Sequence, residues 1–153
     1  MLKNFITDKY IRLDIECSNW EEAIRKSGEQ LLEEKKVTEE YIEDAVNSVK
    51  ELGPYIVVAK GIAVPHTSSH IGVKENGITI TRLKSPVEFG NKRNDPVKYI
   101  FMMATTDFDS HIEILSQLSE YLKDSEFLEI IENAKSSEDI MKYIISKEKL
   151  RGE

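Results

Sequence analysis

The feature that most constrains the fold is an almost uninterrupted apolar run at Val97–Ala104. A strand of this composition is typical of the centre of a sheet whose two faces are both covered by helices. The spacing of apolar residues predicts the other elements: helices at about 18–34, 38–50, 110–123, 125–133 and 137–146, and strands at 55–59, 62–64 and 77–83. This order predicts an α/β sandwich, with a mixed sheet of about four or five strands flanked by helices on both faces.

Length and charge narrow the class of protein further. The 153 residues contain no repeat or Pro/Gly/Ser-rich linker, so we expect one domain over residues 1–153. A content of 40% hydrophobic residues is enough for a packed core. The formal charge of −7 argues against a nucleic-acid partner, because binding to the phosphate backbone needs a clustered basic surface.

Cysteine usage and the first residues bear on the compartment. The single cysteine, Cys17, allows no intramolecular disulfide, which is typical of a reducing compartment. Residues 1–10 lack the apolar stretch of a signal peptide, and no later segment is long and apolar enough to cross a bilayer. We therefore expect a cytoplasmic chain without direct membrane insertion.

A histidine follows the strand predicted at 62–64. Pro65 ends that strand and places His66 just beyond it, within residues 52–74, where there is no Asp or Glu. A neutral imidazole in such a positive segment can accept a phosphoryl group if one nitrogen is unprotonated and the other is hydrogen-bonded. The alternative is an ordinary surface histidine in a loop.

A second histidine lies at the predicted start of a helix. Ser110 and Glu113 have capping-box spacing, so Ser110 is the expected N-cap and His111 the expected first helical residue, beside free backbone N–H groups. Such a helix start can bind an anion. The alternative is a helix start selected for its cap, with His111 exposed by accident.

Other chemistries lack their usual patterns. His66 and His70 have the spacing of a helical metal pair, but the intervening Thr67–Ser69 reads as a loop, so we expect no metal site. Neither a Gly-rich nucleotide loop nor a G-x-S-x-G elbow is present, and we expect no cofactor. Cys17 is either a mildly activated thiol or, more simply, a small apolar residue.

At these residues the chain resembles the enzyme IIA domains of the sugar phosphotransferase system, in the mannitol/fructose class, and most of all the ascorbate-type members. The similarity extends over nearly the whole chain. Its most specific parts are Gly53–Ala59 leading into Gly61–His66, then Pro86–Lys92 with Asp95–Val97, and finally Ser110-His111 opening a Leu-rich helix.

The resemblance implies a phosphotransferase of the cytoplasm, without metal or cofactor. It would take a phosphoryl group from the phosphocarrier HPr on His66 and pass it to a cysteine of an enzyme IIB, which serves a membrane IIC. His111 would help to hold the phosphoryl group. Weaker candidates for contact with this group or with partners are Thr67, Ser110 and Lys50. Lys50 falls where mannitol-type members supply an arginine, but lysine lacks the bidentate fork of arginine.

Two alternative functions are compatible with the same residues. One is a regulatory protein whose phosphorylation at His66 changes which partner it binds, and the other is an interaction module that has lost the chemistry. The presence of both His66 and His111 argues against the second. The sugar and the oligomeric state cannot be derived from these residues.

Overall fold

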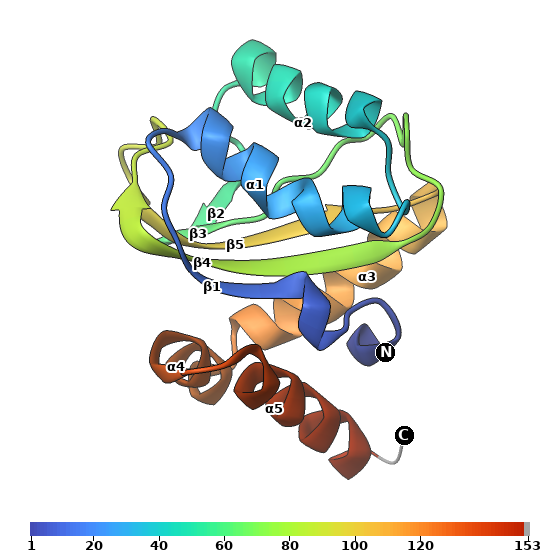
Figure 1. The fold of residues 1–153 in the computed structure, drawn as a ribbon, viewed down its shortest axis with the longest axis vertical. Coiled ribbons are helices and arrows are strands. Elements are labelled where there is room, and N and C mark those ends of the chain that lie inside the picture. The colour runs from blue at the N-terminus through green and yellow to red at the C-terminus, as the bar shows by residue number, and fades with distance from the viewer. Residues whose placement is uncertain (152–153) are drawn as a thin grey trace.

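The computed structural model describes residues 1–151, which form a five-stranded mixed sheet between two layers of helices (Figure 1). The predicted fold class is thereby confirmed. The strands are β1 (Ile11–Ile15), β2 (Val57–Ala59), β3 (Ile62–Ala63), β4 (Gly77–Val87) and β5 (Val97–Ala104). The helices are α1 (Trp20–Glu33), α2 (Glu39–Leu52), α3 (Phe108–Leu122), α4 (Ser125–Asn133) and α5 (Ser137–Leu150).

The strand order is β1-β4-β5-β3-β2, so β5 lies at the centre of the sheet. It pairs antiparallel with β4 and parallel with β3. Helices α1 and α2 cover one face and α3, α4 and α5 the other (Figure 1). This double cover explains why Ile100, Phe101 and Met102 in β5 are all fully buried.

Close approach of α1 and α2 to the sheet depends on small and polar contacts. Gly28 lies against Ile42 and Met102, where a side chain would collide with Ile42. The hydroxyl of Tyr41 donates a buried hydrogen bond to the carbonyl of Met103, which ties α2 to the end of β5. These contacts fix the end of β5 at which the candidate site is found.

Several predicted boundaries differ from the structure. Strand β1 was not predicted, β4 extends beyond residue 83 to Val87, and α5 extends beyond residue 146 to Leu150. Ser18 and Glu21 have the spacing of a capping box, which predicts Ser18 as the N-cap of α1. This prediction is wrong, because Asn19 accepts the hydrogen bond from the backbone N–H of Glu22 and caps α1. Asn is as strong an N-cap residue as Ser, so spacing to a glutamate alone did not distinguish them.

Among residues 1–151, no helix combines the length and apolar character that a membrane span requires.

Candidate phosphoryl-transfer site

The site forms where the parallel strands β3 and β5 end side by side. Ala63 pairs with Ile100, and the two chains then stay in contact as the N–H of Met103 donates to the carbonyl of Pro65 at 3.0 Å. The carboxyl ends of parallel neighbours meet at one edge of the sheet, which is a common place for functional groups. His66, just after β3, and the start of α3, just after β5, therefore converge.

His66 is held with one ring nitrogen hydrogen-bonded. Its Nδ1 lies 2.6 Å from the carbonyl oxygen of Val64. A carbonyl can only accept, so Nδ1 carries the hydrogen and the lone pair of the neutral ring is on Nε2. Tyr55 fixes the same residue from the side, since its hydroxyl donates to the His66 carbonyl at 3.1 Å and its ring meets the imidazole edge-on at 5.7 Å.

His111 contacts the other side of His66. The two ring centroids are 5.3 Å apart, so the two histidines that the sequence places 45 positions apart lie in contact. Nδ1 of His111 is buried and has no hydrogen-bond partner among the described residues. Burial lowers the pKa of His111, and nearby His66 and His70 lower it further.

The predicted N-cap Ser110 is wrong, and with it the placement of His111 as the first helical residue. Asp107 caps α3: its carboxylate accepts from the N–H of Ser110 at 2.8 Å, and its carbonyl accepts from the N–H of His111 at 3.0 Å. Helix α3 begins at Phe108, which is 68% exposed and therefore does not extend the apolar face by which the helix was predicted. His111 thus faces the site with its ring, while its backbone N–H is already bonded.

A third histidine completes a cluster that the sequence did not predict as a unit. The ring of His70 meets that of His111 edge-on, with centroids 6.3 Å apart. Its Nδ1 lies 2.9 Å from the carbonyl of Thr105, directly after β5. The three imidazoles come from the loop between β3 and β4 and from helix α3. Within residues 1–151, no group of three or more His, Cys, Asp or Glu side chains is arranged to hold a metal ion.

The weaker candidates have separate environments. Thr67 is only 4% exposed, and its hydroxyl oxygen is without a hydrogen-bond partner in the described part of the chain. Ser110 is engaged by Asp107, whose carboxyl pKa is lowered chiefly by these hydrogen bonds. Lys50 forms an ion pair with Glu21 at 3.3 Å.

A loop far along the chain supports the segment that leads into β2. The carboxylate of Asp95 accepts from the N–H groups of Phe89, Gly90 and Asn91 at 2.8 to 3.1 Å. The Asn91 side chain in turn donates to the carbonyls of Pro54 and Val57 at 3.4 Å. The Phe-Gly-Asn segment is thus a brace for the strands that present His66, and does not reach the imidazoles itself.

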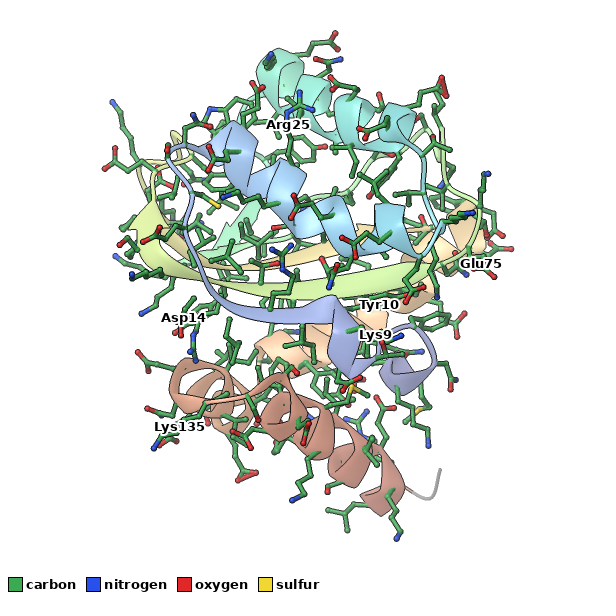
Figure 2. All side chains as sticks on the ribbon, viewed as in Figure 1. Lys9, Tyr10, Asp14, Arg25, Glu75 and Lys135 are labelled. Atoms are coloured by element: carbon green, nitrogen blue, oxygen red, sulfur yellow. The ribbon has the colours of Figure 1, made fainter. Side chains whose placement is uncertain are left out.

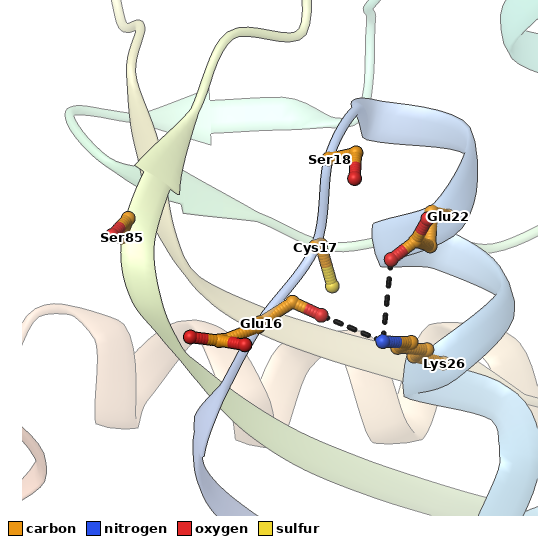
Figure 3. A pocket seen from close by; sticks show the side chains of 6 residues that line it. All are labelled: Glu16, Cys17, Ser18, Glu22, Lys26 and Ser85. Carbon is orange, nitrogen blue, oxygen red and sulfur yellow. Dashed lines mark hydrogen bonds and ion pairs between the residues drawn. The ribbon is translucent and has the colours of Figure 1, made fainter.

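Hollows in the surface are found away from the histidines. One, of about 400 Å³, is lined by Glu16, Cys17, Ser18, Glu22, Lys26 and Ser85 (Figure 3). Lys26 is already bound there to the Glu16 carbonyl at 2.7 Å and to Glu22 at 3.2 Å. Burial raises the pKa of the Cys17 thiol, which agrees with a small apolar residue rather than an activated nucleophile.

Known proteins are similar to this chain in both sequence and fold. The family model of the phosphoenolpyruvate-dependent sugar phosphotransferase system, EIIA 2, matches residues 4–147. The chain is 31% identical over 138 residues to the ascorbate-specific PTS system EIIA component of Escherichia coli (strain K12), with 90% of each chain covered.

Solved structures agree. The mannitol-specific cryptic phosphotransferase enzyme IIA CmtB of Escherichia coli is 32% identical with a TM-score of 0.81, over 91% of this chain and 94% of that one. Mannitol IIA of Escherichia coli is 25% identical with a TM-score of 0.77, over 90% of this chain and 96% of that one.

Sequence and fold together place the chain among the enzyme IIA proteins of a sugar phosphotransferase system. The chain belongs to the EIIA 2 family of the sugar phosphotransferase system, whose members are phosphotransfer components. The resemblance predicted from the residues is confirmed.

Proposed function

We propose that this chain is a cytoplasmic phosphocarrier in which Nε2 of His66 accepts a phosphoryl group from phospho-HPr and donates it to the cysteine of an enzyme IIB. The observation that carries the proposal is the 2.6 Å contact between Nδ1 of His66 and the Val64 carbonyl. It leaves Nε2 as the nucleophile and holds the ring still while the partner changes. Family membership supports the same chemistry.

The transfer itself is a balanced displacement. The Nε2–P bond forms as the P–N bond to the donor imidazole breaks, and the electron pair of the broken bond stays on the donor nitrogen. In the second step a thiolate sulfur of IIB forms the S–P bond, and Nε2 recovers its electron pair. Because the donor is already an activated phosphoryl compound, alignment and positive donors suffice for catalysis.

His111 and Thr67 are the groups best placed to act as donors. The imidazole of His111 contacts His66. The buried hydroxyl of Thr67, next in sequence to His66, has no partner among residues 1–151 that would compete for its hydrogen. Ser110 and Lys50 are already engaged by Asp107 and Glu21, so we place them as contacts for a partner protein rather than for phosphate.

The 31% identity to an ascorbate-specific EIIA component suggests the destination. An enzyme IIA does not bind the sugar, so specificity depends on which IIB fits the surface around His66. We propose an ascorbate-type IIB, and through it the membrane IIC. Contacts are expected from Ser68, Ser69, His70 and residues 107–110, which surround the imidazoles.

The test is reconstitution from phosphoenolpyruvate with purified enzyme I and HPr, followed by intact-mass measurement. The wild-type chain should gain one phosphoryl group and His66→Ala none, while Lys84→Ala, an exposed residue of β4, serves as the matched control. Undiminished phosphorylation of His66→Ala would refute the assignment. Mixing the phosphorylated chain with IIB proteins should give fast loss of phosphate to an ascorbate-type IIB and slow loss to a mannitol-type one. Loss at the rate of spontaneous hydrolysis with both would favour a regulatory function.

A further inference from the structure

A phosphoryl group on His66 brings two negative charges to a site with few free cations. Lys50, the lysine nearest in sequence to the arginine position of mannitol-type members, is paired with Glu21 at 3.3 Å and is half exposed. Arg25 is bound to both Glu21 and Glu43. Burial lowers the pKa of His111, which favours its neutral form. Another group must balance part of the charge.

His70 is built into place beside these imidazoles. Its backbone has φ of 60°, a left-handed conformation that is uncommon for a histidine and persists only where the surroundings hold it. The holding contacts are a hydrogen bond from Nδ1 to the Thr105 carbonyl at 2.9 Å and one from the N–H of Val73 to the His70 carbonyl at 3.3 Å. A loop that merely connects β3 to β4 does not require this geometry.

The bond to Thr105 also determines the chemistry of the ring. Because the Thr105 carbonyl only accepts, Nδ1 of His70 carries its hydrogen, and Nε2 is the nitrogen to which a further proton would bind. The ring stands edge-on to His111 at 6.3 Å, and His111 stands 5.3 Å from His66. A proton on His70 therefore adds positive charge next to His111, which in turn contacts His66.

We propose that His70 is a positioning residue for phosphoryl transfer, which takes up a proton when His66 is phosphorylated and acts across His111 as a cation of the site. This inference rests on the proposed function.

The charged and titratable groups near His70 come from α3 with its N-cap and from α2. His111 on α3 opposes its protonation, whereas Asp107 at the N-cap of α3 favours it, since the two charges attract. Asp44 on α2 reaches the same loop through a hydrogen bond from the Ser69 hydroxyl at 2.6 Å. The carboxylates stabilise a proton on His70, and the negative charge of a phosphoryl group on His66 would stabilise it further.

The first measurement needs no variant. NMR titration of the imidazoles should show the pKa of His70 rising by about one unit when His66 is phosphorylated, because an opposite charge favours the protonated form. By reciprocity, protonated His70 then favours phosphorylation by about tenfold. An unchanged His70 pKa in protein whose His66 is phosphorylated would overturn this inference and leave the proposed function intact. Failure of His66 to accept phosphate would remove both.

The second measurement separates charge from structure. His70→Asn keeps a residue that tolerates the left-handed backbone and has a side-chain amide able to donate to Thr105, but it cannot be charged. The equilibrium constant for transfer from phospho-HPr should be about tenfold lower than wild type at about pH 6 and equal to it at about pH 8.5, well above the range in which imidazoles are ordinarily protonated. His70→Gly, which keeps only the backbone conformation, should give the same pH dependence.

Comparing each variant with wild type at one pH cancels the titration of HPr itself. A merely structural residue would lower transfer by the same factor at both pH values, and that result would overturn the inference. The titration of His111 gives a further readout: its pKa should rise in His70→Asn, because a like-charged neighbour is gone.

Discussion

Nδ1 of His66 lies 2.6 Å from the carbonyl oxygen of Val64, only two positions earlier in the chain. The contact is possible because Pro65 turns the backbone at the end of β3, so that the imidazole folds back on its own strand. A local bond of this kind survives any change of partner protein. It gives a carrier a nucleophile with constant orientation, whichever protein is docked.

The first prediction concerns the nitrogen atoms of His66. The neutral ring should be the tautomer with hydrogen on Nδ1, and phosphate should be attached to Nε2, because the Val64 carbonyl blocks the other nitrogen. Long-range proton–nitrogen NMR spectra of the free and phosphorylated chain distinguish the two nitrogens. A phosphoryl group on Nδ1 would contradict the geometry.

The second prediction is that His111→Ala folds normally but transfers phosphate slowly. Nδ1 of His111 makes no hydrogen bond among the described residues, so the substitution breaks none there. Loss of one donor to developing charge typically costs about 10²–10³ in rate. Rapid-quench kinetics give the rate, and thermal unfolding gives the stability.

His111→Gln is the matched variant, since its amide can still donate a hydrogen bond. It should transfer faster than His111→Ala. Equal rates for both variants and the wild type would remove His111 from the mechanism.

The third prediction is a loss of stability on mild acidification. Burial keeps the pKa of His111 below its ordinary value of 6.5 in the folded chain, so the unfolded chain binds the proton more readily. The contribution of His111 to the free energy of unfolding is therefore complete above the unfolded value and is lost as the pH falls through 6.5 toward the folded pKa.

The denaturation midpoint of the wild-type chain should thus decrease between about pH 7.5 and about pH 5.5, and that of His111→Gln should decrease less. Asp107 and Asp14, whose pKa values are lowered by hydrogen bonds, lose their contributions only in more acidic solution. Identical pH dependence in the two proteins would contradict the prediction.

Much of the fold could be predicted because its main strand and helices have clear patterns of apolar residues. Strand β5 is buried on both faces and reads as a continuous apolar run, and α2 and α4 have clear apolar faces. Strand β1 at the sheet edge could not be predicted in the same way. Its five residues, Ile11 to Ile15, do alternate between apolar and polar, but the segment is short, and the left-handed backbone of Asp14, with φ of 57°, cannot be seen in the sequence.

The site was only partly predictable for a related reason. His66 was marked by a local pattern, Pro after a strand in an acid-free stretch. The position of His70 depends on a long-range bond to Thr105, which is 35 positions away, and no local pattern reports it. The cap of α3 could not be assigned from spacing, because Asp107 and Ser110 are both favourable N-cap residues three positions apart and only the backbone selects between them.

The last prediction concerns Arg82, which joins the sheet to α4. Its side chain is 7% exposed and donates to the carbonyls of Ile131, Glu132 and Ala134 at the end of α4, at 2.8 to 3.2 Å. Its other nitrogens bind Asp14, which lies at the end of β1 facing α4 (Figure 2).

Arg82→Ala removes the donor and leaves carbonyls at this helix end without a partner. At about 1 kcal/mol for each lost bond, the free energy of unfolding should fall by about 2 to 4 kcal/mol. The free energy of unfolding of Arg82→Lys should lie between those of this variant and the wild type, because one ammonium cannot reproduce the fork of the guanidinium.

Lys84→Ala is the control on the same strand. Lys84 and its partner Glu16 are 61% and 72% exposed, and a surface pair contributes less than about 1 kcal/mol. Urea unfolding of the three variants gives the values. Phosphorylation of His66 should stay at the wild-type level in all of them below their unfolding transitions, since the hydrogen bonds of Arg82 go to Asp14 and to the end of α4 and not to the histidines. A stability loss for Arg82→Ala no larger than that for Lys84→Ala would contradict the prediction.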